Sequence, residues 1–215
     1  MTSQGARPTL PTVNQPKLTY FDAPTSRGEE CRLALFVAGV DFIDNRLQRS
    51  DWAALKPNTP FGSLPVFELE GKPAVSQTNA ILGHIGRRYG LLPKDEWEAL
   101  RLESLVGAAE ELRTTISATF GIDDAEELKR RRTELAEGPI RRFGASMEKQ
   151  IVGPFAGGAA ISIADIKLFV VVGWIKKGVL DHIPADTLDA FPKLQAVFTN
   201  VKNHPKVVEW YARAH

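Results

Sequence analysis

The sequence has little that would point to secretion, a membrane or nucleic acid. Its 215 residues include one cysteine, Cys31, which excludes an internal disulfide and a multi-cysteine metal site. The longest apolar run, Leu168 to Trp174, is far shorter than the ~20 residues of a membrane-spanning helix. Twenty-seven basic residues against 26 acidic residues give a net charge of +1, which provides no general attraction to nucleic acid. We therefore expect a cytoplasmic protein that binds no nucleic acid, no membrane and no metal.

The composition is that of an ordinary globular protein, with 43% hydrophobic and 25% charged residues. Periodicity divides the chain near Pro93, because short strand-like segments alternate with helices before it and helical periodicity dominates after it. Residues 1–16 contain three prolines and no apolar core, and we interpret them as a disordered leader. The predicted domains are then 17–92 and 93–215.

The first domain is predicted to contain strand, helix and strand, followed by a hairpin and a helix. The spacing of the first three elements is typical of two parallel strands joined by a crossover helix. The expected elements are a strand at Lys17–Phe21, a helix at Arg27–Gly39, a strand at Asp41–Leu47, a hairpin of Val66–Leu69 and Ala74–Val75, and a helix at Ser76–Tyr89. The second domain is predicted to be helical at Asp95–Thr119, Asp123–Gln150, Ser162–Lys177, Leu188–Lys202 and Pro205–Ala214.

Three segments of the first domain carry residues suited to binding a small polar ligand. A cis bond between Leu64 and Pro65 would leave the Leu64 backbone free to pair with a peptide-like ligand, although a trans edge proline is the commoner arrangement. Gln77 and Thr78 open an apolar helix, where free N–H groups attract a carboxylate, although a plain helix cap is the simpler interpretation. Tyr20 ends the first strand, where its phenol can reach a cleft or pack against a neighbouring strand.

Taken together and in this order, these segments resemble a cytosolic glutathione transferase of the tyrosine type, closest to the sigma-like class. The matching segments are Lys17–Phe21, Asp51-Trp52 with Lys56, Pro60-Phe61-Gly62, Leu64-Pro65-Val66, Ser76 to Ile81, Ser162 to Asp165, Phe191 to Leu194 and His204 to Val207. The resemblance implies an α+β protein, in which an N-terminal thioredoxin-like βαβ-ββα domain precedes an all-α domain. It also implies glutathione as co-substrate and conjugation of its thiol to small hydrophobic electrophiles.

The resemblance assigns roles to individual residues. Tyr20 is expected to donate a hydrogen bond to the glutathione sulfur and so favour the reactive thiolate. Ser26 is its rival, because the loop Asp22 to Arg27 is one residue longer than in tyrosine-type members and resembles the serine-type arrangement. Arg27 is expected to support the thiolate electrostatically. The predicted glutathione-binding residues are Tyr20, Trp52, Lys56, Ser63, Leu64, Pro65, Gln77 and Thr78, and the predicted electrophile pocket contains Phe21, Ile116, Phe120 and the Trp210-Tyr211 segment.

The chain departs from the family pattern at Gly107, where alignment on Glu111-Leu112-Arg113 expects an aspartate that reaches glutathione in the neighbouring subunit. Glu103 or Glu110 can compensate, and weaker glutathione binding is expected otherwise. The resemblance implies a homodimer, with Phe61 either inserted into the other subunit or buried in the core. Two alternatives to conjugation stay open: a glutathione-dependent isomerase or peroxidase on the same site, and a non-enzymatic binding or structural protein with this fold.

Overall fold

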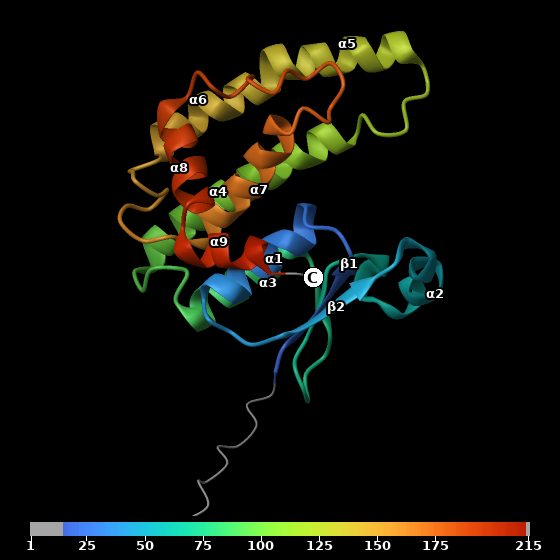
Figure 1. The fold of residues 1–215 in the computed structure, drawn as a ribbon, viewed down its shortest axis with the longest axis vertical. Helices are drawn as coiled ribbons and strands as arrows, with labels where there is room; N and C mark the ends of the chain where they lie inside the picture. Colours follow the sequence, from blue (N-terminus) through green and yellow to red (C-terminus); the bar gives the residue numbers. More distant parts are fainter. Residues whose placement is uncertain (1–14, 214–215) are drawn as a thin grey trace, which may run out of the picture.

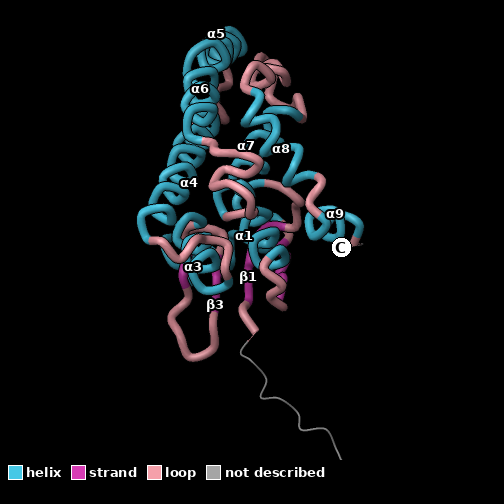
Figure 2. The backbone as a smooth tube through the Cα atoms, turned by 90° about the vertical axis from the view of Figure 1, so that its left-hand side faces the viewer, coloured by secondary structure: helices cyan, strands magenta, loops and turns pink. Residues whose placement is uncertain are grey.

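The computed structural model describes residues 15–213, so the predicted leader lies almost entirely outside the described residues (Figure 1). Within this range the strands occupy the first part of the chain, and the chain after Ser76 is helical, with only turns and loops between helices (Figure 2). The α+β class is therefore confirmed, whereas the exact domain boundary stays a prediction. Over the same range, no helix combines the length and hydrophobicity that crossing a bilayer requires.

The sheet has four strands in the order β2-β1-β3-β4. The strands are β1 (Lys17–Phe21), β2 (Ile43–Leu47), β3 (Val66–Glu68) and β4 (Val75–Ser76). As predicted, β1 and β2 are parallel, and β3 and β4 form an antiparallel hairpin that pairs with β1 through β3. Helix α1 (Ser26–Val37) contacts β1 and packs against α3 (Thr78–Tyr89).

Most predicted bounds in this half shift by one or two residues, and one shift moves a residue from a helix to a strand. Ser76 belongs to β4 rather than to the following helix, because Gln77 has φ +78° and ψ 106° and so separates the strand from α3. Before β3, the chain makes several short helical segments. They are 3₁₀ turns at Arg49–Asp51, Lys56–Asn58 and Pro60–Gly62, and the single turn α2 (Trp52–Leu55).

The second half contains α4 (Glu96–Ser117), α5 (Ala125–Leu135), α6 (Arg141–Gln150), α7 (Ile163–Lys176), α8 (Pro192–Lys202) and α9 (Pro205–Ala212). The single helix predicted over Asp123–Gln150 is continuous but contains a π-helical turn at Ala136–Ile140. Pro139 lies in this turn, which fits its missing N–H donor, since a wider turn tolerates one absent intrahelical bond.

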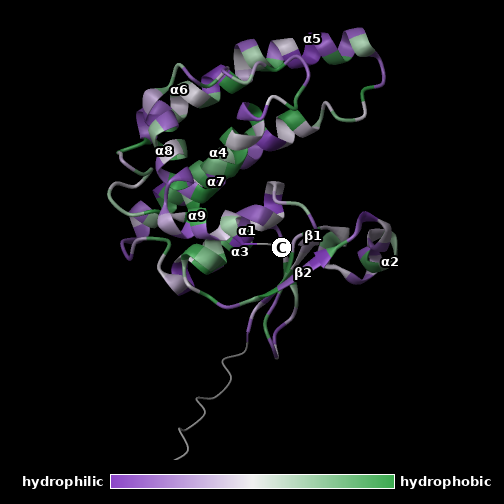
Figure 3. Cartoon of the chain, viewed as in Figure 1, coloured by the Kyte–Doolittle hydropathy of each residue, from purple (hydrophilic) through white to green (hydrophobic). Residues whose placement is uncertain are grey.

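Helix α7 lies at the centre of the helical half and contacts α1, α4 and α8. Figure 3 shows it largely in hydrophobic colours, whereas α5 is mostly hydrophilic. Its start is fixed by a capping box, in which Ser162 N donates to Asp165 Oδ2 over 2.8 Å and the Ser162 hydroxyl donates to the same oxygen over 2.6 Å. Ala156 N also donates to Asp165 Oδ1 over 2.6 Å. One buried carboxylate therefore satisfies donors on the loop and on the helix.

Replacing this carboxylate should destabilise the whole fold. We expect Asp165→Ala to lower the free energy of unfolding by about 2–4 kcal/mol, because it removes a helix cap and leaves buried donors unpaired. Asp124→Ala is the matched control, since Asp124 caps the exposed start of α5 and its loss should cost about 1 kcal/mol. Urea denaturation measures both, and equal losses would contradict the structural role of Asp165.

Candidate functional site

A polar cavity of about 370 Å³ lies at the start of α3, between α1 and α4. Its lining residues are Arg27, Ser63, Leu64, Gln77, Thr78, Asn79, Glu110 and Thr114. The sequence-predicted site residues among them are Arg27, Ser63, Leu64, Gln77 and Thr78. The Leu64–Pro65 bond is cis, the arrangement that the sequence left open. The structure therefore brings three separate sequence segments to one cavity.

Among the residues that line this polar cavity, Thr78 has a buried side-chain oxygen that lacks a hydrogen-bond partner within the described residues. Its side chain is on a residue only 4% exposed, and Oγ1 has no hydrogen-bond partner among the described residues. An unpaired buried hydroxyl costs roughly 1–3 kcal/mol, so a polar ligand that accepts from it would recover that free energy. Thr78 is also the first residue of α3, where backbone N–H groups favour an anion.

The two residues that carry the candidate hydroxyls make different contacts near the start of α1. The Tyr20 ring packs on Gly28, where a Cβ would collide with it, and its centroid is 5.9 Å from Arg32 Cζ. Ser26 has φ +64°, and its Oγ accepts a hydrogen bond from Arg113 Nη1 over 2.9 Å. Neither residue is among those that line the polar cavity.

Ser26 instead lines a small cavity of about 210 Å³, together with Thr25, Arg113, Ser117, Phe120 and Trp174. Ser26 and Arg113 of this cavity are sequence neighbours of Arg27 and Thr114, which line the polar cavity. The Phe120 ring stacks on Trp174 with centroids 6.0 Å apart. The other two predicted electrophile residues do not reach it. Ile116 is fully buried, and Phe21 packs against Trp52, with ring centroids 6.0 Å apart.

Trp52 and Lys56 stand one turn apart, as predicted, since Lys56 N donates to Trp52 O. Trp52 is half-buried, and Lys56 is exposed and lies over Gly62. Neither lines the polar cavity. The structure therefore keeps their predicted spacing but places them outside the group of residues that meet at α3.

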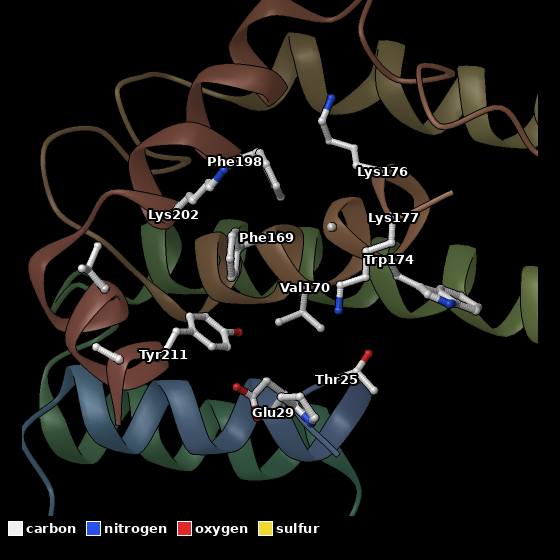
Figure 4. Close-up of a pocket in the computed structure, with 14 residues that line it drawn as sticks. Thr25, Glu29, Phe169, Val170, Trp174, Lys176, Lys177, Phe198, Lys202 and Tyr211 are labelled. Atoms are coloured by element: carbon white, nitrogen blue, oxygen red, sulfur yellow. The ribbon is translucent and has the colours of Figure 1, made fainter. Parts of the chain in front are cut away.

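A larger apolar cavity of about 910 Å³ lies between α1, α7, α8 and α9 (Figure 4). It shares Thr25 and Trp174 with the small cavity, so the two adjoin. Tyr211 lines it and points toward Glu29, and burial together with the Glu29 carboxylate raises the pKa of the Tyr211 phenol. Trp210 is buried, and its Nε1 donates to Glu29 Oε1 over 2.7 Å. Of the predicted Trp210-Tyr211 segment, only Tyr211 lines this cavity.

Sequence reasoning missed a group of buried charges behind the polar cavity. Glu30 and Lys167 are fully buried, and Lys167 Nζ donates to Glu30 Oε2 over 2.8 Å. Arg113 donates to the other oxygen of Glu30. Lys167 also donates to Glu110 and, over 3.2 Å, to Asn79 Oδ1, so it touches two residues of the cavity lining.

Glu110 joins these buried charges to the cavity, because Arg27 Nε donates to its Oε1 over 2.8 Å. Burial alone would favour the neutral acid, but Lys167 and Arg27 outweigh it and lower the pKa of Glu110. The carboxylate is therefore charged at neutral pH. Within the described residues, no three His, Cys, Asp or Glu side chains gather in a way that would hold a metal ion.

Comparison with protein families gives matches over both halves of the chain. Residues 16–87 match the family described as glutathione S-transferase, N-terminal domain, and residues 110–214 match glutathione S-transferase, C-terminal domain. The chain is 31% identical over 206 residues to glutathione S-transferase 1 of Ascaris suum, with 92% of this chain and 96% of the relative covered. It is 28% identical over 199 residues to S-crystallin SL11 of Nototodarus sloanii, with 90% and 93% covered.

Solved structures with the same fold include prostaglandin synthase D of Nilaparvata lugens, with a TM-score of 0.82 and 28% identity. That similarity covers 94% of this chain and 98% of the other. The glutathione S-transferase of Ascaris lumbricoides gives a TM-score of 0.74 and 30% identity, covering 92% and 96%. The matches extend across the sheet, the polar cavity and the helical half together.

Proposed function

Because this chain belongs to the glutathione S-transferase family, whose activity is glutathione conjugation, we propose that its polar cavity binds glutathione and that its residues ionise the thiol. The observation that supports this most directly is the buried Thr78 hydroxyl at the start of a helix, which has no hydrogen-bond partner within residues 15–213. Glutathione is a tripeptide with two carboxylates, one of which suits this position.

The tripeptide would lie along the polar cavity in an extended form. Gln77 and Thr78 would hold the γ-glutamyl carboxylate, to which the dipole of α3 adds about 0.3–1 kcal/mol. The backbone of Leu64 would pair with the cysteinyl residue, in the manner of an added strand. Trp52 and Lys56 would face the glycyl carboxylate at the outer end.

The reaction needs the thiolate, because a thiol with a pKa near 8.5 is only a few per cent ionised at neutral pH. A hydroxyl that donates to the sulfur stabilises the anion, and lowering the thiol pKa by ~2 corresponds to roughly 2.7 kcal/mol. Tyr20 is the proposed donor, Ser26 its rival, and Arg27 an electrostatic support. The thiol proton leaves to solvent, and the sulfur lone pair forms a C–S bond as the electrophile loses its leaving group or π bond.

The electrophile would bind in the small cavity beside Phe120, with the adjoining apolar cavity available for a longer substrate (Figure 4). Both cavities are lined by Thr25, the residue that precedes α1, and Ser26, the first residue of α1, lines the small cavity. A hydrophobic substrate fits the lining of aromatic and aliphatic side chains. Holding it next to the thiolate supplies proximity in addition to activation.

Cys31 is no rival nucleophile. It is fully buried in α1, and burial together with Glu30 raises the pKa of its thiol. A reactive cysteine needs exposure and a lowered pKa, and Cys31 has neither. We place the reaction in the cytoplasm, where such a free thiol stays reduced.

Phe61 supports a homodimer. It is 82% exposed and has φ +57°, so the alternative of a buried core position is wrong. A large aromatic side chain held in this way on the surface is typical of an interface residue. We propose that it inserts into a second copy of the chain.

Thr78→Val tests the binding site. We expect glutathione to bind roughly 5- to 150-fold more weakly by calorimetry, because the variant removes about 1–3 kcal/mol of hydrogen bonding. Its free energy of unfolding without ligand should not fall and should rise by up to about 1–3 kcal/mol, since the variant removes a buried hydroxyl that has no partner among the described residues. Thr115→Val, on an exposed residue outside the cavity, is the control. An unchanged dissociation constant in Thr78→Val would count against the site.

Tyr20→Phe and Ser26→Ala identify the thiol activator. We expect Tyr20→Phe to lower the thiolate fraction of bound glutathione by about 10- to 30-fold at pH 7, measured by ultraviolet absorbance, and kcat/KM in parallel. A loss confined to Ser26→Ala would make Ser26 the donor instead. Binding without any thiolate in the wild-type protein would favour the non-enzymatic alternative.

Phe61→Ser tests the dimer. We expect the variant to sediment as a monomer at concentrations where the wild-type protein is a dimer, because interface aromatic residues often carry more than about 2 kcal/mol. Val179→Ser, another exposed apolar residue, serves as the control and should leave the mass unchanged. A Phe61→Ser variant that sediments like the wild-type protein would refute the key role.

A further inference from the structure

Five charged side chains meet behind the polar cavity, and we name them the inner charge cluster: Arg27, Glu30, Glu110, Arg113 and Lys167. They come from α1, α4 and α7. Glu30 and Lys167 are fully buried, and Arg113 is only 3% exposed. Each carboxylate accepts hydrogen bonds from at least two side-chain donors, Glu30 from Lys167 and Arg113, and Glu110 from Lys167 and Arg27.

The inner charge cluster carries a surplus of positive charge. Three cations face two carboxylates, which leaves a net charge of +1. The neighbouring charges of α1 form a separate group with a net charge of −1, in which Arg32 pairs with Asp44 over 2.8 Å and lies 3.6 Å from Glu29. Neither carboxylate lines the polar cavity, and Glu29 accepts a hydrogen bond from Trp210 Nε1 instead. On α7, Asp165 is engaged in the capping box at the helix start. Among these charged residues, those that line the polar cavity belong to the inner charge cluster.

This surplus lies next to the site of the proposed thiolate. Arg27 and Glu110 line the polar cavity, and Asn79, which accepts from Lys167, lines it as well. Charges in a poorly hydrated interior act over longer distances than charges in water. A net cation at this position favours any anion in the cavity.

Folding stability alone is a poor explanation for Lys167. Removing an ion from water costs several kcal/mol, and well-packed apolar residues often replace buried ion pairs without loss. Lys167 occupies a helix that is otherwise suited to an apolar side chain. Its contacts instead run to all three helices that form the cavity, which are α1 through Glu30, α3 through Asn79 and α4 through Glu110.

We propose that Lys167 is a positioning residue of the reaction: the inner charge cluster that it completes fixes Arg27 and Glu110 at the glutathione pocket and stabilises the bound thiolate by its net positive charge. This inference rests on the proposed function. It adds an electrostatic activator, supplied by the helical half, to the hydroxyl that touches the sulfur. It also explains why buried cations of α4 and α7 are directed toward α1.

Three variants change the cluster charge in a known way. Lys167→Met lowers it from +1 to 0, Glu30→Gln raises it to +2, and the double variant restores +1. The measurement is the pKa of the glutathione thiol in the complex, followed by ultraviolet absorbance of the thiolate against pH. We expect this pKa to rise by about 1 in Lys167→Met and to fall in Glu30→Gln, the scale of a unit charge acting through an effective dielectric constant of about 20. The double variant should match the wild-type protein.

Lys206→Met is the matched control, because it removes one positive charge from an exposed pair with Glu209 and should leave the thiol pKa unchanged. A purely structural role predicts shifts in the same direction for both single variants, and that result overturns the inference. Any order of pKa values other than Lys167→Met above wild type and double variant, with Glu30→Gln lowest, does so too. Should Lys167→Met fail to fold, the Glu30→Gln and double variants still give two ordered values.

The failures of the two proposals are distinguishable. A wild-type protein that binds no glutathione overturns the proposed function together with this inference. A wild-type protein that binds and ionises glutathione, with a thiol pKa that ignores the cluster charge, overturns only the inference.

Discussion

The carboxylate of Glu30 receives hydrogen bonds from Lys167 and Arg113 inside the interface between the two halves of the chain. Removing one partner of such a buried group typically costs about 3–5 kcal/mol, because it leaves a charge uncompensated. The helices α1, α4 and α7 can therefore shift little relative to one another without breaking a hydrogen bond to Glu30. The polar cavity has walls from α1, α3 and α4, so its shape depends on this contact.

The same helix, α7, supplies both the apolar core and the charge. Helix α7 packs against α1, α3, α4 and α8, which accounts for the apolar residues on either side of Lys167. Asp165 fixes where the helix begins, and Lys167 follows two residues later. The cap thus sets the register that brings the ammonium group to Glu30. The helix cap at Asp165 in the second half of the chain therefore helps to place the positive charge of Lys167 beside Glu30 in the first half.

Much of this arrangement could be predicted from sequence. The order of strands and helices followed from the periodicity of apolar residues. Ser63, Leu64, Gln77 and Thr78 could be singled out because they lie in short segments with recognisable sequence patterns, and all four line one cavity. The inner charge cluster could not be predicted in this way. Its partners are 83 and 137 residues apart, and nothing local links them. One signal existed: a lysine within an apolar helix must find an anion.

The boundary residues that the sequence misplaced share a physical cause. Gln77 adopts a positive φ that ends β4 and starts α3, and no propensity for glutamine indicates such a conformation. Ser26 likewise has a positive φ at the end of the longer loop. Both residues line one of the candidate cavities. Such overrides of local preference are commonest where a site is built.

Tyr20 and Ser26 are the two candidate hydrogen-bond donors to the glutathione sulfur, and different contacts fix the position of each side chain. Tyr20 depends on the bare backbone of Gly28, because any side chain there would displace its ring. Ser26 accepts from Arg113, which uses an oxygen lone pair and leaves the Ser26 proton free for another acceptor. Arg113 is in turn held by Glu30. The serine-type option is thus tied to the inner charge cluster through Arg113, whereas the tyrosine-type option depends on the space that one glycine leaves for the ring.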